Sequence, residues 1–286
     1  MLYYLYMTGF FLARVVPLRF SYVVAELIAR IYFLMAFRDR RVLRENMEVV
    51  IGPETSRREL NRNVLGIFKN FAKYLVDFFR FPRFTEDFIS SNIDIQGRQN
   101  LDACLAQGRG AILVAPHLGN WELGAALVGG LGYEIYAIVL EHSNPRINDF
   151  FMSQRAINGV GNIPTGRSIK RCFKVLSRNK VLAIAADKDY TSTGVEVDFF
   201  GRKALLPRGA AVMALRTGAP IIFTVLTREK GDKFRLVFER PLEYDITGDS
   251  EQDVKTIIEG YASLFEEYIR KYPDQWYAFT KVWSPR

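Results

Sequence analysis

The chain has 286 residues, of which 49% are hydrophobic and 24% are charged, and this balance indicates a folded globular protein rather than a disordered one. Its net charge of +8 favours an anionic partner, but nucleic acid, anionic lipid, an acidic carrier protein and a nucleotide-bearing cofactor all qualify. The two cysteines, Cys104 and Cys172, lack any CxxC or Cys/His spacing, which argues against a disulfide framework and a zinc site.

Residues 1–37 are the most hydrophobic part of the sequence. The uncharged opening run is shorter than the roughly 20 residues that a spanning helix needs, and it lacks the basic start and cleavage site of a signal peptide. Beyond Pro17 the pattern is amphipathic, with Arg19, Glu26 and Arg30 on one narrow stripe. Such a helix lies in the membrane interface, or spans the membrane with its polar stripe toward protein. A core helix of a soluble protein is the alternative.

A cluster of arginines follows this hydrophobic segment and favours the cytoplasmic side of a membrane, namely Arg38, Arg40, Arg41 and Arg44. We therefore expect residues 1–45 to form a helical membrane-associating segment. Residues 59–81 predict a second amphipathic helix with a stripe of phenylalanine and basic residues beside it. That stripe suits core packing, and it equally suits an acyl chain under an anionic headgroup.

From residue 93 the pattern alternates between strands and helices. The predicted strands are 111–115, 134–140, 181–186, 221–226 and 234–238. The predicted helices are 101–106, 121–128, 147–158, 168–177, 209–216 and 252–271. Strands separated by helices of this length indicate crossover connections. The sequence therefore predicts an α/β fold for residues 46–286, as one domain whose mostly parallel central sheet is flanked by helices.

The first candidates for chemistry lie around the strand at 111–115. His117 follows this strand, at the place where open α/β sheets bind their ligands, and Glu122 lies in the first turn of the next helix, for which Asn120 is a suitable N-cap. A histidine can take a proton from an alcohol near neutral pH, and a carboxylate on its other ring nitrogen would orient it. A purely capping role for His117 is also compatible with the pattern.

Further polar residues follow other predicted strands. His142 has a glutamate and a serine beside it, but adjacent residues on an extended chain point in opposite directions, so a local triad is geometrically poor. Asp187 and Asp189 resemble a metal site that bridges phosphates in a nucleotide-sugar glycosyltransferase, which the intervening Lys188 weakens. Arg208, at the start of the helix 209–216, could seat a phosphate or belong to a solvated basic loop.

The run from His117 to Glu122, His-Leu-Gly-Asn-Trp-Glu, closely resembles the signature of the late acyltransferases of lipid A biosynthesis, within the His-x4-Asp/Glu lysophospholipid acyltransferase group. Other blocks resemble the same family in order along nearly the whole chain: Arg41-Val42 with Asn46-Met47, Asn144-Pro145 with Arg155 and Gly159, Asp187 with Gly194-Val195, Phe199-Phe200-Gly201, Leu206-Pro207 and Gly209, Thr217–Pro220, and Pro273–Tyr277. The sequence departs from the family at Lys188, where glutamine is usual, and at 278–281.

This resemblance implies an enzyme at the cytoplasmic face of the cell inner membrane. It would move a fatty acyl group from a thioester, on acyl carrier protein or coenzyme A, to a hydroxyl of a lipid acceptor, foremost a lipid A precursor. His117 would be the general base and Glu122 would orient it. The expected substrate-binding residues are Arg155, Asp187, Lys188, Arg208, Gly119 and Asn120. No cofactor, bound metal or nucleic-acid partner is expected.

In the expected mechanism, His117 deprotonates the acceptor hydroxyl, which attacks the thioester carbonyl directly. A backbone N–H near Gly119 or the guanidinium of Arg155 would stabilise the oxyanion. Two other functions stay open. One is a metal-dependent glycosyltransferase that acts on a lipid acceptor through Asp187 and Asp189, and the other is a non-catalytic membrane-binding protein.

Overall fold

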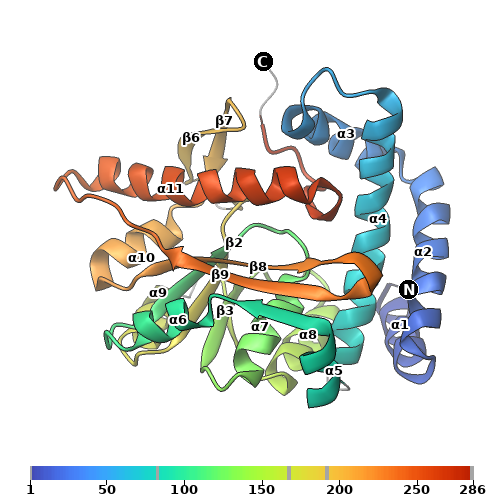
Figure 1. Ribbon diagram of the computed structural model, residues 1–286, viewed down its shortest axis with the longest axis horizontal. Helices are drawn as coiled ribbons and strands as arrows, with labels where there is room; N and C mark the ends of the chain where they lie inside the picture. The colour runs from blue at the N-terminus through green and yellow to red at the C-terminus, as the bar shows by residue number, and fades with distance from the viewer. Residues whose placement is uncertain (1, 82–83, 166–168, 191–192, 284–286) are drawn as a thin grey trace.

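Seven strands form one sheet in the order β1-β9-β8-β2-β5-β3-β4 in the computed structural model, which describes residues 2–81, 84–165, 169–190 and 193–283 (Figure 1). The strands are β1 (Ile93–Gln96), β2 (Ala111–Ala115), β3 (Ile135–Val139), β4 (Val160–Pro164), β5 (Val181–Ala185), β8 (Ile221–Arg228) and β9 (Phe234–Pro241). The run from β8 to β4 is parallel, whereas β9 pairs with β8 in the antiparallel sense. A separate antiparallel pair joins β6 (Val195–Phe199) to β7 (Arg202–Leu206). The predicted mostly parallel sheet is confirmed.

Helices cover both faces of this sheet (Figure 1). One face carries α9 (Ile169–Leu176), α10 (Gly209–Thr217) and α11 (Ser250–Lys271), and the other carries α6 (Arg98–Leu105) and α7 (Trp121–Gly130). Because successive side chains of a strand point to opposite faces, Ile112 and Val114 of β2 pack into the first layer and Leu113 into the second. Helix α5 (Glu86–Asn92) packs against the edge strand β1, and α8 (Pro145–Ile157) packs against β4 at the opposite edge of the sheet.

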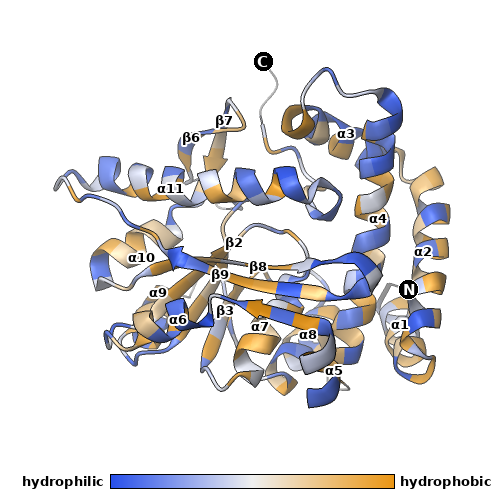
Figure 2. Cartoon of the chain, in the orientation of Figure 1, coloured by the Kyte–Doolittle hydropathy of each residue, from blue (hydrophilic) through white to orange (hydrophobic). Residues whose placement is uncertain are grey.

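The N-terminal part is helical: α1 (Leu2–Val15), α2 (Leu18–Met35), α3 (Phe37–Ile51) and α4 (Arg57–Arg80). Helix α4 packs against α1, α2, α3 and α7, and so joins this part to the sheet. The outer side of α2 is apolar and unpacked (Figure 2), since Phe20, Val24 and Leu27 are each at least half exposed. None of the described helices alone is long and apolar enough to cross a membrane, although α2 and α3, bent by 94°, pass that test of length and composition as a pair.

Each predicted strand is present, and each predicted helix also, with ends that differ by at most three residues; Ser168, the predicted start of one helix, lies outside the described residues. Strands β1, β4, β6 and β7 are absent from the prediction. The edge strands β1 and β4 carry polar residues, such as Asp94 and Asn162, in place of an apolar run, and β7 occupies part of the stretch expected as a basic loop. Helix α3 runs through position 45. The division of the chain into a membrane-associating segment and an α/β domain at that residue stays a prediction.

Candidate active site

The site lies at the carboxyl ends of two neighbouring parallel strands. Ala115 of β2 is opposite Ala185 of β5, and His117 and Asp187 each follow two residues later, so the register brings them side by side. Nδ1 of His117 lies 2.5 Å from Oδ1 of Asp187. The backbone N–H of His117 also donates to Oδ2 of Asp187 at 3.0 Å. These two contacts fix both the histidine ring and its backbone.

Asp187 is fully buried, and burial alone would raise its pKa. The neighbouring His117 and Lys188 and the indole N–H of Trp276, which donates to Oδ2 at 2.9 Å, instead hold the pKa of Asp187 well below its usual range. The group is therefore a carboxylate at neutral pH. With Nδ1 engaged by this carboxylate, Nε2 is the ring nitrogen of His117 that a ligand in the adjoining cavity could contact.

Glu122 does not orient His117 as expected, because Asp187 is the residue that contacts Nδ1 of His117. The carboxylate of Glu122 instead accepts from Arg155 of α8, with Nε 2.8 Å from Oε2 and Nη2 2.5 Å from Oε1. Helix α7 turns Glu122 toward α8 rather than back along the loop. The side chains are only 7% and 12% exposed, so this is a bidentate ion pair with little solvent screening. Burial would lower the pKa of Arg155, but Glu122 raises it overall, which keeps the guanidinium charged.

Gly119 and Asn120 serve the loop between His117 and α7. Gly119 has φ +65°, and a Cβ there would lie 2.0 Å from the carbonyl oxygen of Leu226, so the close approach requires glycine. Its N–H donates to the carbonyl of Gln275 at 2.9 Å and is therefore not available for an oxyanion. Asn120 is the N-cap of α7 as predicted, since its Oδ1 accepts from the N–H of Leu123 at 3.0 Å.

The other two expected substrate-binding residues do not line the cavity beside His117. Nζ of Lys188 donates to the carbonyl of Tyr277 at 2.8 Å, and burial lowers the pKa of Lys188. Arg208 lies at the N-terminus of α10, on the opposite face of the sheet from α7, with Nη2 2.5 Å from Oε1 of Glu251. Both residues have protein partners that account for their positions.

The two aspartates of the glycosyltransferase alternative are engaged separately. Asp187 contacts His117 and Trp276, whereas Oδ2 of Asp189 accepts from the N–H of Gly194 at 2.8 Å. Within the part of the chain that the structure describes, no three metal-ligating side chains come together. His142 lines the same cavity as His117 and packs on Phe151, with ring centroids 4.9 Å apart.

A cavity of about 330 Å³ extends from His117 between α7 and the sheet. Small side chains on the inner face of the strands make this space, namely Ala115, Ala137, Ala183 and Ala185. At the carboxyl end His117, Glu122 and Arg155 line it, and at the other end Ile135 and Val128. The site thus combines a carboxylate-backed histidine with a long apolar space.

Sequence reasoning missed two residues of this arrangement. The sequence points to Trp276 only within the block Pro273–Tyr277, and it does not point to Asp77, whose carboxylate accepts from Nδ2 of Asn120 at 3.0 Å. Asp77 lies about 100° or more around the helix 59–81 from its phenylalanine stripe, so the local pattern places it on the polar side, and only the packing of α4 buries it.

Comparison with known proteins gives a consistent result. A family model described as bacterial lipid A biosynthesis acyltransferase matches residues 1–284. A phosphatidylinositol mannoside acyltransferase of Mycobacterium tuberculosis strain H37Rv is 32% identical over 254 residues, which cover 81% of this chain and 77% of that protein. A protein of the same description from Mycolicibacterium smegmatis is 30% identical over 249 residues, covering 84% and 78% respectively.

Proposed function

Since the chain belongs to the bacterial lipid A biosynthesis acyltransferase family and is a lipid acyltransferase, we propose that it moves a fatty acyl group from a thioester to a hydroxyl of a sugar-bearing lipid. The observation that carries this proposal is His117, backed by the Asp187 carboxylate, at the end of an apolar cavity. The glycosyltransferase and the non-catalytic alternatives are set aside, because the family and its relatives are acyltransferases.

In the proposed reaction, Nε2 of His117 takes the proton of the acceptor hydroxyl while that oxygen attacks the thioester carbonyl carbon. The new C–O bond forms, the C–S bond breaks, and the sulfur leaves as a thiol after the imidazolium returns the proton. Asp187 stabilises the imidazolium and holds its ring. It takes the role that the sequence had suggested for Glu122.

The oxyanion is proposed to face the N-terminus of α7. The amide of Gly119 is already engaged, whereas Trp121 and Glu122 occupy the first turn, whose N–H groups have no carbonyl partner four residues earlier in the helix. Arg155, oriented by Glu122, is proposed to contact the acceptor or the thioester end of the donor, because it lines the cavity with its charge retained.

The cavity is proposed to hold the acyl chain. Its lining extends from the level of Ala185 back to Ile135, which pairs with Val181 four residues deeper. Four residues of strand correspond to about 13 Å. A fully extended chain advances about 1.25 Å per carbon, given C–C bonds of about 1.5 Å and near-tetrahedral angles. The cavity therefore accommodates on the order of ten carbons of the chain beyond the reacting carbonyl.

The protein is proposed to work on the cytoplasmic face of the cell inner membrane. Three observations support an interfacial position: the exposed apolar side of α2, the basic cluster that follows α2, and Tyr6 of α1, which lines the cavity. An acyl chain could thus pass from the lipid surface into the cavity along α1. The basic surface also suits the acidic carrier or the phosphates of the donor.

The test is acyl transfer by the full chain on vesicles. Acyl thioesters of coenzyme A and of acyl carrier protein are each offered with a phosphatidylinositol mannoside and with a lipid A precursor, and the products are identified by mass spectrometry. We expect one acceptor to gain one acyl group, in chelator as well as in buffer. We expect His117→Ala to abolish the transfer while the protein stays folded, with a lower melting temperature because the buried Asp187 loses a partner. Full turnover by this variant would refute the proposal.

A further inference from the structure

A buried carboxylate that the reaction does not use lies between the N-terminal helices and the active-site loop. Asp77 of α4 is 0% exposed. Its Oδ1 accepts from the hydroxyl of Tyr22 at 2.5 Å, and its Oδ2 accepts from Nδ2 of Asn120 at 3.0 Å and from Nη2 of Arg228. A buried charge is tolerated only with such partners, so the three donors define one position for this side chain.

The three donors come from three separate parts of the fold. Tyr22 belongs to α2, Arg228 ends β8, and Asn120 lies in the loop three residues after His117. Asn120 uses its two amide atoms in different directions, because Nδ2 donates to Asp77 while Oδ1 caps α7. The position of the first turn of α7 is therefore linked directly to α4, and through the hydroxyl of Tyr22 to α2.

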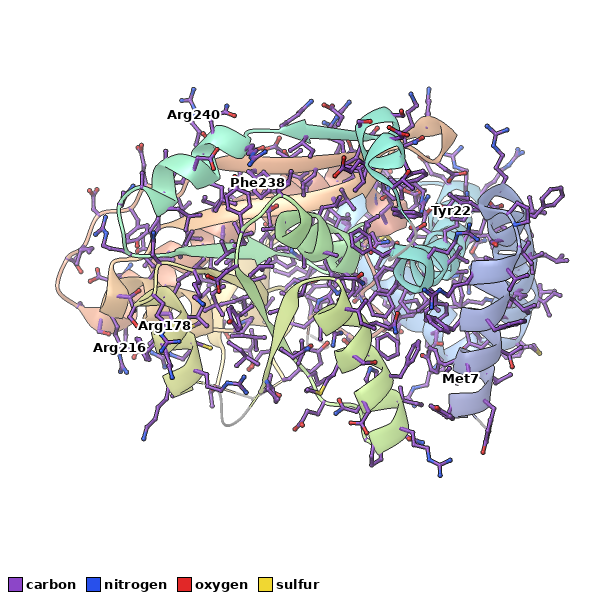
Figure 3. The ribbon with its side chains drawn as sticks, turned by 90° about the horizontal axis from the view of Figure 1, so that it is seen from below. Met7, Tyr22, Arg178, Arg216, Phe238 and Arg240 are labelled. Carbon is purple, nitrogen blue, oxygen red and sulfur yellow. The ribbon has the colours of Figure 1, made fainter. Side chains whose placement is uncertain are left out.

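Helix α2 has two different sides. Tyr22 (Figure 3) is only 4% exposed and contacts Asp77 of α4, whereas Phe20 and Leu27 are 66% and 57% exposed. Ion pairs hold the same inner side, since Glu26 lies 2.7 Å from Nζ of Lys69 and 3.0 Å from Nζ of Lys73. The hydroxyl of Tyr22 thus gives α2 its direct hydrogen bond to Asp77, beside a longer chain of ion pairs that leads from Glu26 through Lys73, Asp232 and Arg228 to the same carboxylate.

We propose that Asp77 is a positioning residue that couples the seating of α2 on a lipid surface to the geometry of the loop at His117. The coupling runs from Tyr22 to Asp77, to Asn120 and to the first turn of α7. It rests on the proposed interfacial function, because α2 is the side that meets the lipid. The proposal predicts that the loop is less restrained in protein free of lipid than in protein bound to a lipid surface.

The experiment compares Tyr22→Phe with Tyr32→Phe, both in α2. The first removes only the hydroxyl that binds Asp77, and the second removes a hydroxyl that binds Asp39 at the exposed end of the helix, 3.2 Å away. On vesicles of phosphatidylglycerol and phosphatidylcholine, we expect Tyr22→Phe to lower kcat at least about fivefold with unchanged KM, because a small misplacement of reacting groups is costly. Tyr32→Phe should match the unmodified protein.

A second variant separates the link from the helix cap. Asn120→Ser keeps a side-chain oxygen that can cap α7 but has no amide to donate to Asp77. We expect it to reproduce the fall in kcat of Tyr22→Phe with a melting temperature close to that of the unmodified protein. An unchanged kcat in both variants would overturn the proposal.

Hydrogen exchange provides a readout that does not depend on the reaction. Vesicles of the same composition should slow exchange in segment 118–124 of the unmodified protein and of Tyr32→Phe, and should not do so in Tyr22→Phe. If all three proteins bind the vesicles and segment 118–124 responds equally in each, the coupling is wrong while the interfacial function stands. If the unmodified protein does not bind the vesicles, the interfacial function itself fails, and the coupling with it.

Discussion

The two faces of the central sheet are made by the same strands but differ in what they contain. On β5, Leu182 and Ile184 point into the packed layer under α9, α10 and α11, whereas Ala183 and Ala185 point toward α7 and line the cavity. On β2, Val114 faces the packed layer and Ala115 the cavity. Large and small residues alternate along each strand, so one face of the sheet is closely packed and the other leaves room for a cavity.

The largest effect that separates the two faces is on stability. Leu182 is fully buried in the packed layer, so Leu182→Ala should lower the free energy of unfolding by about 2–5 kcal/mol. Denaturant titration measures this loss. Because the cavity face is untouched, the preference for acyl-chain length should not change. A changed chain preference in this variant would mean that the two faces are not independent.

Substitutions on the cavity face should instead change the preference for acyl-chain length. Ala183→Leu places a larger side chain midway along the cavity, at the level of Ala137 and two residues behind Ala185. We expect discrimination of about tenfold or more against the longest accepted chains, measured with a series of acyl thioesters. The matched variant Ile135→Ala enlarges the far end and should favour longer chains. Equal chain preference in both variants would contradict an acyl chain in this cavity.

A smaller effect concerns pH and the carboxylate on which His117 rests. The pKa of Asp187 is lowered on folding, so its stabilising contribution is complete above the unfolded value of about 3.9 and is lost as the pH falls toward the folded value. Between pH 5 and pH 3, the unmodified protein should lose about 1 kcal/mol more stability than Asp187→Asn. Parallel pH dependence of unfolding in the two proteins would contradict an ionised, buried Asp187.

Much of the fold could be predicted because its signals are local. The buried run 111–115, the N-cap at Asn120 and the alternation of strands with helices identify the parallel sheet without knowledge of which strands are neighbours. The edge strands β1 and β4 could not be found in this way, since their polar residues give no apolar run. Only pairing with β9 and β3 makes them strands.

The site shows the same limit more sharply. His117 could be found from its place after a strand, but its partner depends on β2 and β5 being adjacent, which the local pattern does not contain. The nearest carboxylate in sequence, Glu122, was therefore the natural expectation, and the structure gives the contact to Asp187, 70 residues away. Glu122 instead pairs with Arg155, and that pair also depends on the packing of α7 beside α8.

The most direct test compares the two carboxylates as variants. Asp187→Asn and Glu122→Gln each remove one negative charge, and kcat and KM are measured on vesicles with saturating donor. We predict that Asp187→Asn lowers kcat by roughly 10³-fold or more. Glu122→Gln should mainly raise the KM of a substrate, because Arg155 loses its ion pair with Glu122. A larger loss of kcat in Glu122→Gln than in Asp187→Asn would contradict the claim that Asp187 is the carboxylate that supports His117.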